Sequence, residues 1–198
     1  MLDKKYAKKV MENQSQIDKA RRDLQAFSSQ ILGSSKRAIF ALHRDAPQDA
    51  RKELDEAKQG IKRGNELTKK QGRLTFEGAW RAAQEEYAEA CVFEQYVRTG
   101  SVGPVEGVSA DPDIFIGAIS DLLGEMVRLS ITRVVAGDRS FVATAFYDAR
   151  EIVSFLLQMD LTGGLRSKVD QAKQHLRKIE EMNYDVQLRA GDSRRSVA

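Results

Sequence analysis

The stretch DPDIFIGAISDLLGEMVRLSITRVVAGD, residues 111–138, constrains the fold more than any other part of the chain. Asp111 is placed to cap a helix, Pro112 suits the first helical position, and Gly137 suits the left-handed position after the helix end. Between these ends the sequence is apolar on most sides of a helix. The pattern therefore predicts one long helix that is buried, either inside one chain or between chains.

This helix also carries a polar stripe at helical spacing, formed by Asp121, Glu125, Arg128 and Thr132. Two carboxylates one turn apart on a mostly buried helix need compensation, because an unpaired buried charge is costly. A metal ion, an arginine or a water-filled cavity can each supply that compensation. The functional hypothesis begins from this stripe.

The remaining sequence predicts an all-α bundle of about six to seven helices in a single domain. Only three prolines interrupt a composition rich in helix-forming residues, and no strand pattern is found. Helices are predicted over residues 3–43 (or two helices joined near Gly33), 48–70, 74–98, 111–137, 139–159 and 165–188, with a Gly- and Ser-rich loop over 99–110. The domain is expected to span residues 1–190, followed by a disordered tail over 191–198.

Charge is unevenly distributed, although the formal net charge is only +3. The balance is +7 over residues 1–70, −6 over 71–138 and +2 over 139–198. An acidic centre between basic ends is compatible with a cation site inside and a polyanion outside, or with an ordinary solvated helical surface. No transmembrane span or secretory signal is expected, and the single Cys91 fits a reducing compartment, so we expect a cytoplasmic protein.

A second pair of acids lies in the segment QEEYAEACVF. Glu86 and Glu89 are three residues apart and share a helix face, as do Asp121 and Glu125 at a spacing of four. Antiparallel packing of the two helices would bring four carboxylates together, and a site made of carboxylate oxygens suits Mg²⁺ or Mn²⁺. The alternative is structural: Glu86 and Glu89 face solvent, and the other two acids pair with Arg128 or Arg81.

Other reactive residue types are interpreted as structural. His43 and His175 are far apart in the sequence on amphipathic helices, and we expect neither to be catalytic. Cys91 has no neighbouring histidine and is expected in the core. Trp80 is expected to be a packing residue, and Glu85 and Glu94 are expected to face solvent.

Several segments resemble one known family. DLLGEMVRLSITRVVAGD resembles the signature of the translin and translin-associated factor X family, and KIEEMNYDVQLRAG resembles its C-terminal helix. FEGAWRAA and SSKRAIFALHR are also similar to family segments. The resemblance covers residues 15–191. It implies a translin-like helical fold that assembles into a hollow oligomer, commonly an octamer, binding single-stranded RNA or DNA.

The two branches of the family differ in chemistry. The factor X branch carries a metal-dependent endoribonuclease site with Glu-x-x-Glu on one helix and Asp-x-x-Gly-Glu on another. The corresponding residues here are Glu86, Glu89, Asp121 and Glu125. The histidines that translin carries beside its Trp-Arg are absent, since Glu77, Gly78 and Ala79 occupy that neighbourhood.

We therefore expect a Mg²⁺- or Mn²⁺-dependent endoribonuclease that cuts single-stranded RNA inside a homo-oligomeric cavity, with Glu86, Glu89, Asp121 and Glu125 as metal ligands and catalytic acids. The alternative is a non-catalytic binder of single-stranded RNA or DNA of the translin type. The expected nucleic-acid contacts are Lys62, Arg63, Lys69, Lys70, Arg73, Arg81 and Arg128.

Overall fold

The described part of the chain is entirely α-helical apart from one short 3₁₀ helix and the connecting loops. This computed structural model describes residues 1–108 and 111–195, with side chains described up to residue 189. The elements are α1 (Lys4–His43), α2 (Pro47–Lys70), η1 (Gly72–Phe76), α3 (Gly78–Thr99), α4 (Pro112–Val135), α5 (Ser140–Leu156) and α6 (Gly163–Arg195). The predicted fold class is confirmed.

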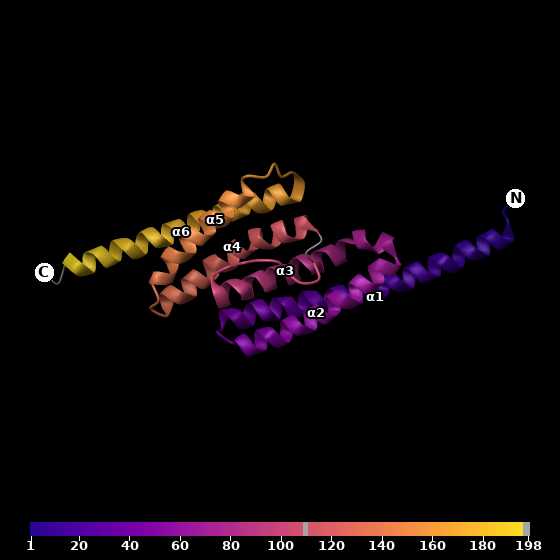
Figure 1. The fold of residues 1–198 in the computed structure, drawn as a ribbon, viewed down its shortest axis with the longest axis horizontal. Helices are drawn as coiled ribbons and strands as arrows, with labels where there is room; N and C mark the ends of the chain where they lie inside the picture. The colour runs from indigo at the N-terminus through magenta and orange to yellow at the C-terminus, as the bar shows by residue number, and fades with distance from the viewer. Residues whose placement is uncertain (109–110, 196–198) are drawn as a thin grey trace.

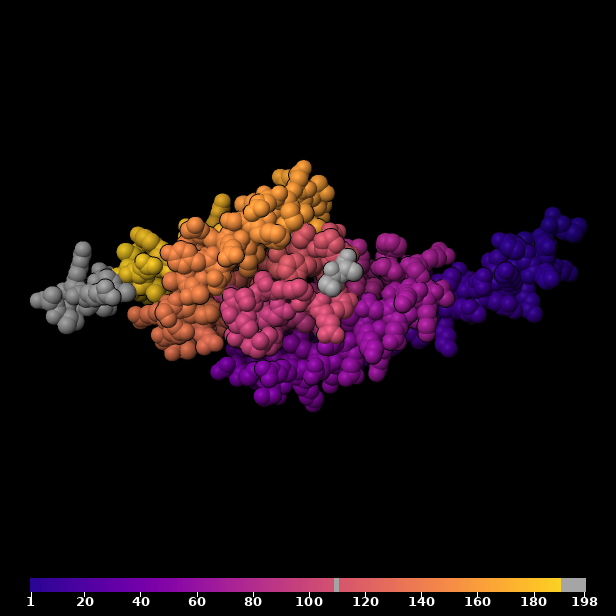
Figure 2. Space-filling model, viewed as in Figure 1, coloured from indigo at the N-terminus to yellow at the C-terminus, as the bar shows by residue number. Residues whose placement is uncertain are grey.

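The helices form an elongated bundle with α3 and α4 in the middle (Figure 1). Helices α1 and α2 pack together, and α1 also covers α3; on the other side α4 packs against both α5 and α6. The N-terminal part of α1 and the C-terminal part of α6 extend past the bundle at opposite ends, as Figures 1 and 2 show. The central helix pair is therefore the natural place for a site.

The caps predicted from the sequence set both ends of α4. The Asp111 side chain accepts a hydrogen bond from the Asp113 backbone N–H at 3.0 Å, and α4 begins at Pro112. Gly137 has φ 94°, so it takes the left-handed position just after α4. The sequence allowed either one helix or two helices joined near Gly33. The structure has one, since α1 is continuous through Gly33.

Two predicted boundaries differ. The segment before α3 is a 3₁₀ turn, so α3 begins at Gly78 rather than at residue 74. Helix α6 runs to Arg195 rather than ending at residue 188, and disorder of the tail stays a prediction. Residues 196–198 of that predicted tail lie outside the described residues.

The apolar helix α4 is buried along most of its length but not at its end. Leu122, Leu123 and Met126 are fully buried, whereas Ile131 and Val135 are 51% and 83% exposed. The same holds for α1, where Leu24 and Ile31 are buried. Farther toward its N-terminus Tyr6, Val10 and Met11 are exposed, because this part of α1 lies beyond the other helices.

The two glycines inside α2 are explained by close helix contacts. A Cβ at Gly60 would lie 2.6 Å from the Cγ1 atom of Ile31, and a Cβ at Gly64 would collide with the ring of Trp80. Glycine costs about 1 kcal/mol of helix propensity, and here it lets α2 approach α1 and α3. Trp80 is 1% exposed, as expected of a packing residue.

No helix in the described part of the chain combines the length and apolar character needed to cross a membrane.

Candidate active site

The four predicted acids come from the two central helices. Glu86 and Glu89 lie on α3, Asp121 and Glu125 lie on α4, and these helices pack directly against each other. All four side chains are partly buried rather than solvated. The alternative in which Glu86 and Glu89 face solvent is therefore wrong for this chain.

A lysine from α6 shows that acids of the two helices converge. The Nζ atom of Lys168 lies 2.6 Å from Asp121 Oδ2 on α4 and 2.9 Å from Glu85 Oε2 on α3. Burial lowers the pKa of Lys168, but its hydrogen bonds to Asp121 and Glu85 outweigh burial and leave the pKa raised. Glu85 was expected to face solvent; it is instead half-buried and ion-paired.

Glu89 is the acid with the least compensation. No hydrogen bond or ion pair joins it to any side chain in the described ranges. Burial, followed by the charges of Asp121, Glu86 and Glu125, raises its pKa to about 8. A desolvated carboxylate among three other carboxylates is the arrangement that a cation stabilises most.

Glu86 lies at the solvent side of the same group. Burial is the largest cause that raises its pKa, and the charges of Asp121 and Glu125 add to it. Lys36 of α1 opposes this shift from a distance of 4.0 Å, measured between Lys36 Nζ and Glu86 Oε2.

A histidine from the last turn of α1 holds the fourth acid. His43 Nε2 forms a hydrogen bond with Glu125 Oε2, and the His43 side chain is only 5% exposed. The imidazole ring packs on Phe93 of α3, with 4.8 Å between ring centroids. Arg128 Nη1 lies 3.8 Å from the same Glu125 carboxylate, so Arg128 orients an acid here.

Two flanking helices thus contribute the same pair of residue types. Lys36 and His43 are seven residues apart on α1, and Lys168 and His175 are seven residues apart on α6. His175 packs on α4, where a Cβ at Gly124 would lie 3.4 Å from His175 Nε2. Burial lowers the pKa of His175, and the charges of Asp121 and Glu125 oppose that shift.

Sequence reasoning missed these four basic residues. The repeated Lys-x₆-His spacing was present and places both members on one helix face, since seven residues make about two turns. No local signal linked that spacing to acids more than 40 positions away. Both histidines nevertheless lie beside the acids, and neither has a hydrogen-bond partner for its buried Nδ1 atom.

The acids are not arranged to hold a metal in this structure. Within residues 1–108 and 111–189, no group of three or more His, Cys, Asp or Glu side chains lies close enough together to bind one ion. Asp121 is engaged by Lys168, and Glu125 by His43. The chemistry of the donors still suits Mg²⁺ or Mn²⁺, because all four are carboxylates and no side chain in the described ranges forms an ion pair with Glu89.

The basic residues of α2 lie on another side of α3. Lys62, Lys69 and Lys58 line a groove that Glu106 closes, with 2.7 Å between Lys58 Nζ and Glu106 Oε2. This groove neighbours Cys91, which lies roughly 200° around the helix from Glu89. Within one chain, the α2 groove and the acids therefore face different directions.

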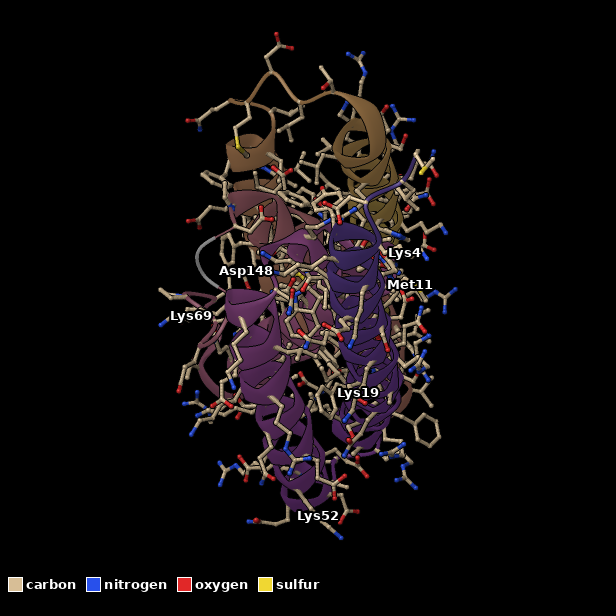
Figure 3. The ribbon with its side chains drawn as sticks, turned by 90° about the vertical axis from the view of Figure 1, so that its right-hand side faces the viewer. Lys4, Met11, Lys19, Lys52, Lys69 and Asp148 are labelled. Carbon is tan, nitrogen blue, oxygen red and sulfur yellow. The ribbon has the colours of Figure 1, made fainter. Side chains whose placement is uncertain are left out.

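The other predicted nucleic-acid contacts are either exposed or already ion-paired. Arg63, Lys70 and Arg73 are exposed, and Figure 3 shows Lys52 and Lys69 projecting outward from α2. Arg81 instead pairs with Asp111 and Asp113, at 3.6 and 3.7 Å. RNA contact by these residues stays a prediction.

Cys91 is not placed for nucleophilic chemistry. Burial raises the pKa of its thiol to about 12, which leaves almost no thiolate at neutral pH.

The Translin family model matches residues 18–190. No protein with a curated function matches the sequence. The structure described as apo-NeC3PO has a TM-score of 0.85 at 22% identity and covers 94% of this chain and 98% of its own. A complex of AfC3PO with duplex RNA has a TM-score of 0.83 at 18% identity, with 92% and 97% covered. These structural similarities extend over nearly the whole bundle.

Proposed function

Because this chain belongs to the translin family, we propose that it is an RNA-binding protein that cleaves RNA with the help of a divalent cation held by the α3 and α4 acids. The observation that supports the proposal is Glu89, a partly buried carboxylate that is repelled by Glu86, Asp121 and Glu125 and forms no ion pair with any side chain in the described ranges. The RNA complex of the similar AfC3PO supports RNA as the ligand.

The four carboxylates would hold Mg²⁺ or Mn²⁺, since hard oxygen donors suit these ions. When bound, such an ion supplies an activated water and stabilises the leaving oxygen in phosphodiester hydrolysis. The chain's own side chains do the positioning: His43 fixes the Glu125 carboxylate from one side, and Arg128 approaches the same carboxylate from the surface.

We also propose self-assembly into a hollow homo-oligomer, such as an octamer, in the cytoplasm. Exposed apolar residues support it: Ile131 and Val135 at the end of α4, and Tyr184 and Leu188 on the projecting part of α6. Apolar residues left in water at one end of a bundle are typical of an interaction surface. Assembly would also let the α2 groove of one copy face the acids of another.

One assay tests the enzymatic proposal. Labelled RNA, in single-stranded and duplex form, is incubated with the full chain in Mg²⁺, in Mn²⁺ or in EDTA, and both retention and cleavage are measured. Asp121→Asn is expected to lower cleavage by about a thousandfold while retention stays unchanged, because the variant loses a ligand but no basic surface. The exposed Asp170, which pairs with Lys173, gives the matched control Asp170→Asn.

Two results would count against the proposal. If Asp121→Asn cleaves RNA in EDTA as fast as the wild type does in Mg²⁺, the α3 and α4 acids are not the active site. Retention of RNA by the wild type without any metal-dependent product would instead favour the non-catalytic binder of single-stranded RNA or DNA.

A further inference from the structure

Lys168 occupies a position between the two helices that carry the acids. Its ammonium group touches Asp121 of α4 and Glu85 of α3, and its side chain is 27% exposed. Among the described residues, Lys173, on the same helix, pairs only with Asp170 three residues earlier. Lys168 instead connects three helices at the centre of the bundle.

Helix α4 is shaped to admit this side chain. Gly117 lies one turn before Asp121, and a Cβ at that position would lie 3.3 Å from Lys168 Nζ and 3.7 Å from Lys168 Cδ. The φ angle of Gly117 is not in the left-handed region, so the backbone does not require glycine there. The missing side chain therefore serves the contact with Lys168, which is an observation independent of the charges.

The contact also bears on cation binding. The Asp121 carboxylate either accepts the hydrogen bond from the ammonium group or binds a divalent cation beside Glu89, because two cations in one partly buried space repel each other. Binding of the cation is then weakened by the fraction of molecules in which Lys168 holds Asp121. Glu85 offers the ammonium group a second carboxylate on the side away from Glu125.

We propose that Lys168 is a positioning residue that substitutes for the divalent cation: it holds Asp121 while the cation is absent, and releases Asp121 but keeps Glu85 when the cation binds. This role rests on the proposed function and adds to it. It makes the affinity for the cation depend on α6 as well as on the acids of α3 and α4.

The test measures metal affinity rather than activity. Mn²⁺ is titrated calorimetrically into the metal-free full chain, comparing the wild type with Lys168→Met. The variant keeps the aliphatic stem and loses the competing charge, so it is expected to bind Mn²⁺ about tenfold more tightly. Lys173→Met, on the same helix, is the matched control and is expected to bind Mn²⁺ within about twofold of the wild type.

A second variant keeps the lysine charge. Gly117→Ala places a methyl group against Lys168 and improves helix propensity, so it is expected to tighten Mn²⁺ binding by a smaller factor than Lys168→Met. This variant decides the matter if Lys168→Met does not fold. If the wild type binds Mn²⁺ but the folded variants bind it no more tightly, the role of Lys168 is overturned while the proposed metal site stands.

Failure of the proposed function has a different signature. If the wild type binds no Mn²⁺, or if Asp121→Asn binds it as tightly as the wild type, the metal site itself is wrong and the role of Lys168 falls with it.

Discussion

The two flanks of the acid group use the same residue types in opposite ways. On α1, His43 is buried and holds Glu125, whereas Lys36 is 68% exposed and only approaches Glu86. On α6, Lys168 holds Asp121 directly. His175 packs against Gly124 there and has no partner for its Nδ1 atom.

The difference follows from depth. His43 lies at the end of α1 where the ring meets Phe93, so an aromatic side chain fits and stays. Lys168 lies beside a groove near the start of α6, lined by Thr162 and Leu165, so its charged end reaches inward from a solvated stem. His43 on α1 is thus a fixed structural support, whereas the Lys168 side chain on α6 can leave Asp121 without unpacking the bundle. Three predictions test this contrast.

The largest effect is expected on the α1 flank. His43→Ala removes a buried ring and leaves the Glu125 carboxylate without its partner, so the protein should lose about 3 kcal/mol of stability. For a chain of this size that lowers Tm by roughly 6–12 °C, measured by thermal unfolding. A change below roughly 2 °C would show that the α1 flank is not a structural support.

An effect of intermediate size is expected at Glu89, between the two flanks, where substitution should raise stability rather than lower it. Ionised Glu89 opposes folding, because the folded pKa of about 8 exceeds the ordinary value of 4.5. Stability should therefore fall as pH rises from 4.5 through 8, and Glu89→Gln removes that loss. In EDTA the variant should nearly equal the wild type near pH 5 and melt several degrees higher at pH 8.

The matched control for Glu89→Gln is Glu94→Gln, on the same helix and paired with Arg98. A gain in Tm for Glu89→Gln that is equal at both pH values would show that ionisation of Glu89 is not its cause.

The smallest effect is expected at Lys36. Its exposed ammonium lies 4.0 Å from Glu86, and such pairs contribute about 0–1 kcal/mol. Lys36→Met should change the free energy of unfolding by less than about 0.5 kcal/mol, as measured by urea denaturation. A loss as large as that of His43→Ala would mean that both members of the α1 pair support the fold.

Much of the fold could be predicted because its signals are local. Asp111, Pro112 and Gly137 define the ends of α4 through backbone rules that act within a few residues. The start of α3 could not be predicted from the sequence. Leu74 is buried, as a residue of the predicted helix would be, but it lies in a 3₁₀ turn. The last helix, predicted over 165–188, extends to Arg195.

The candidate site was only half visible in the sequence. The acids could be found because each pair shares a helix face and the two pairs resemble a family pattern. The basic partners could not, because Lys168 and His43 meet Asp121 and Glu125 only through tertiary packing of α6 and α1. Gly117 and Gly124 have no distinguishing sequence signal, because the side chains that pack on them, Lys168 and His175, come from α6.

The contact between Trp80 and Gly64 gives the molecule a built-in optical reporter. Trp80 is the only tryptophan of the chain, and its indole is enclosed where α2 crosses α3. An indole shielded from water emits at shorter wavelength than a hydrated one. Separation of α2 from the helix that carries Glu86 and Glu89 would therefore shift the fluorescence to the red, without any label.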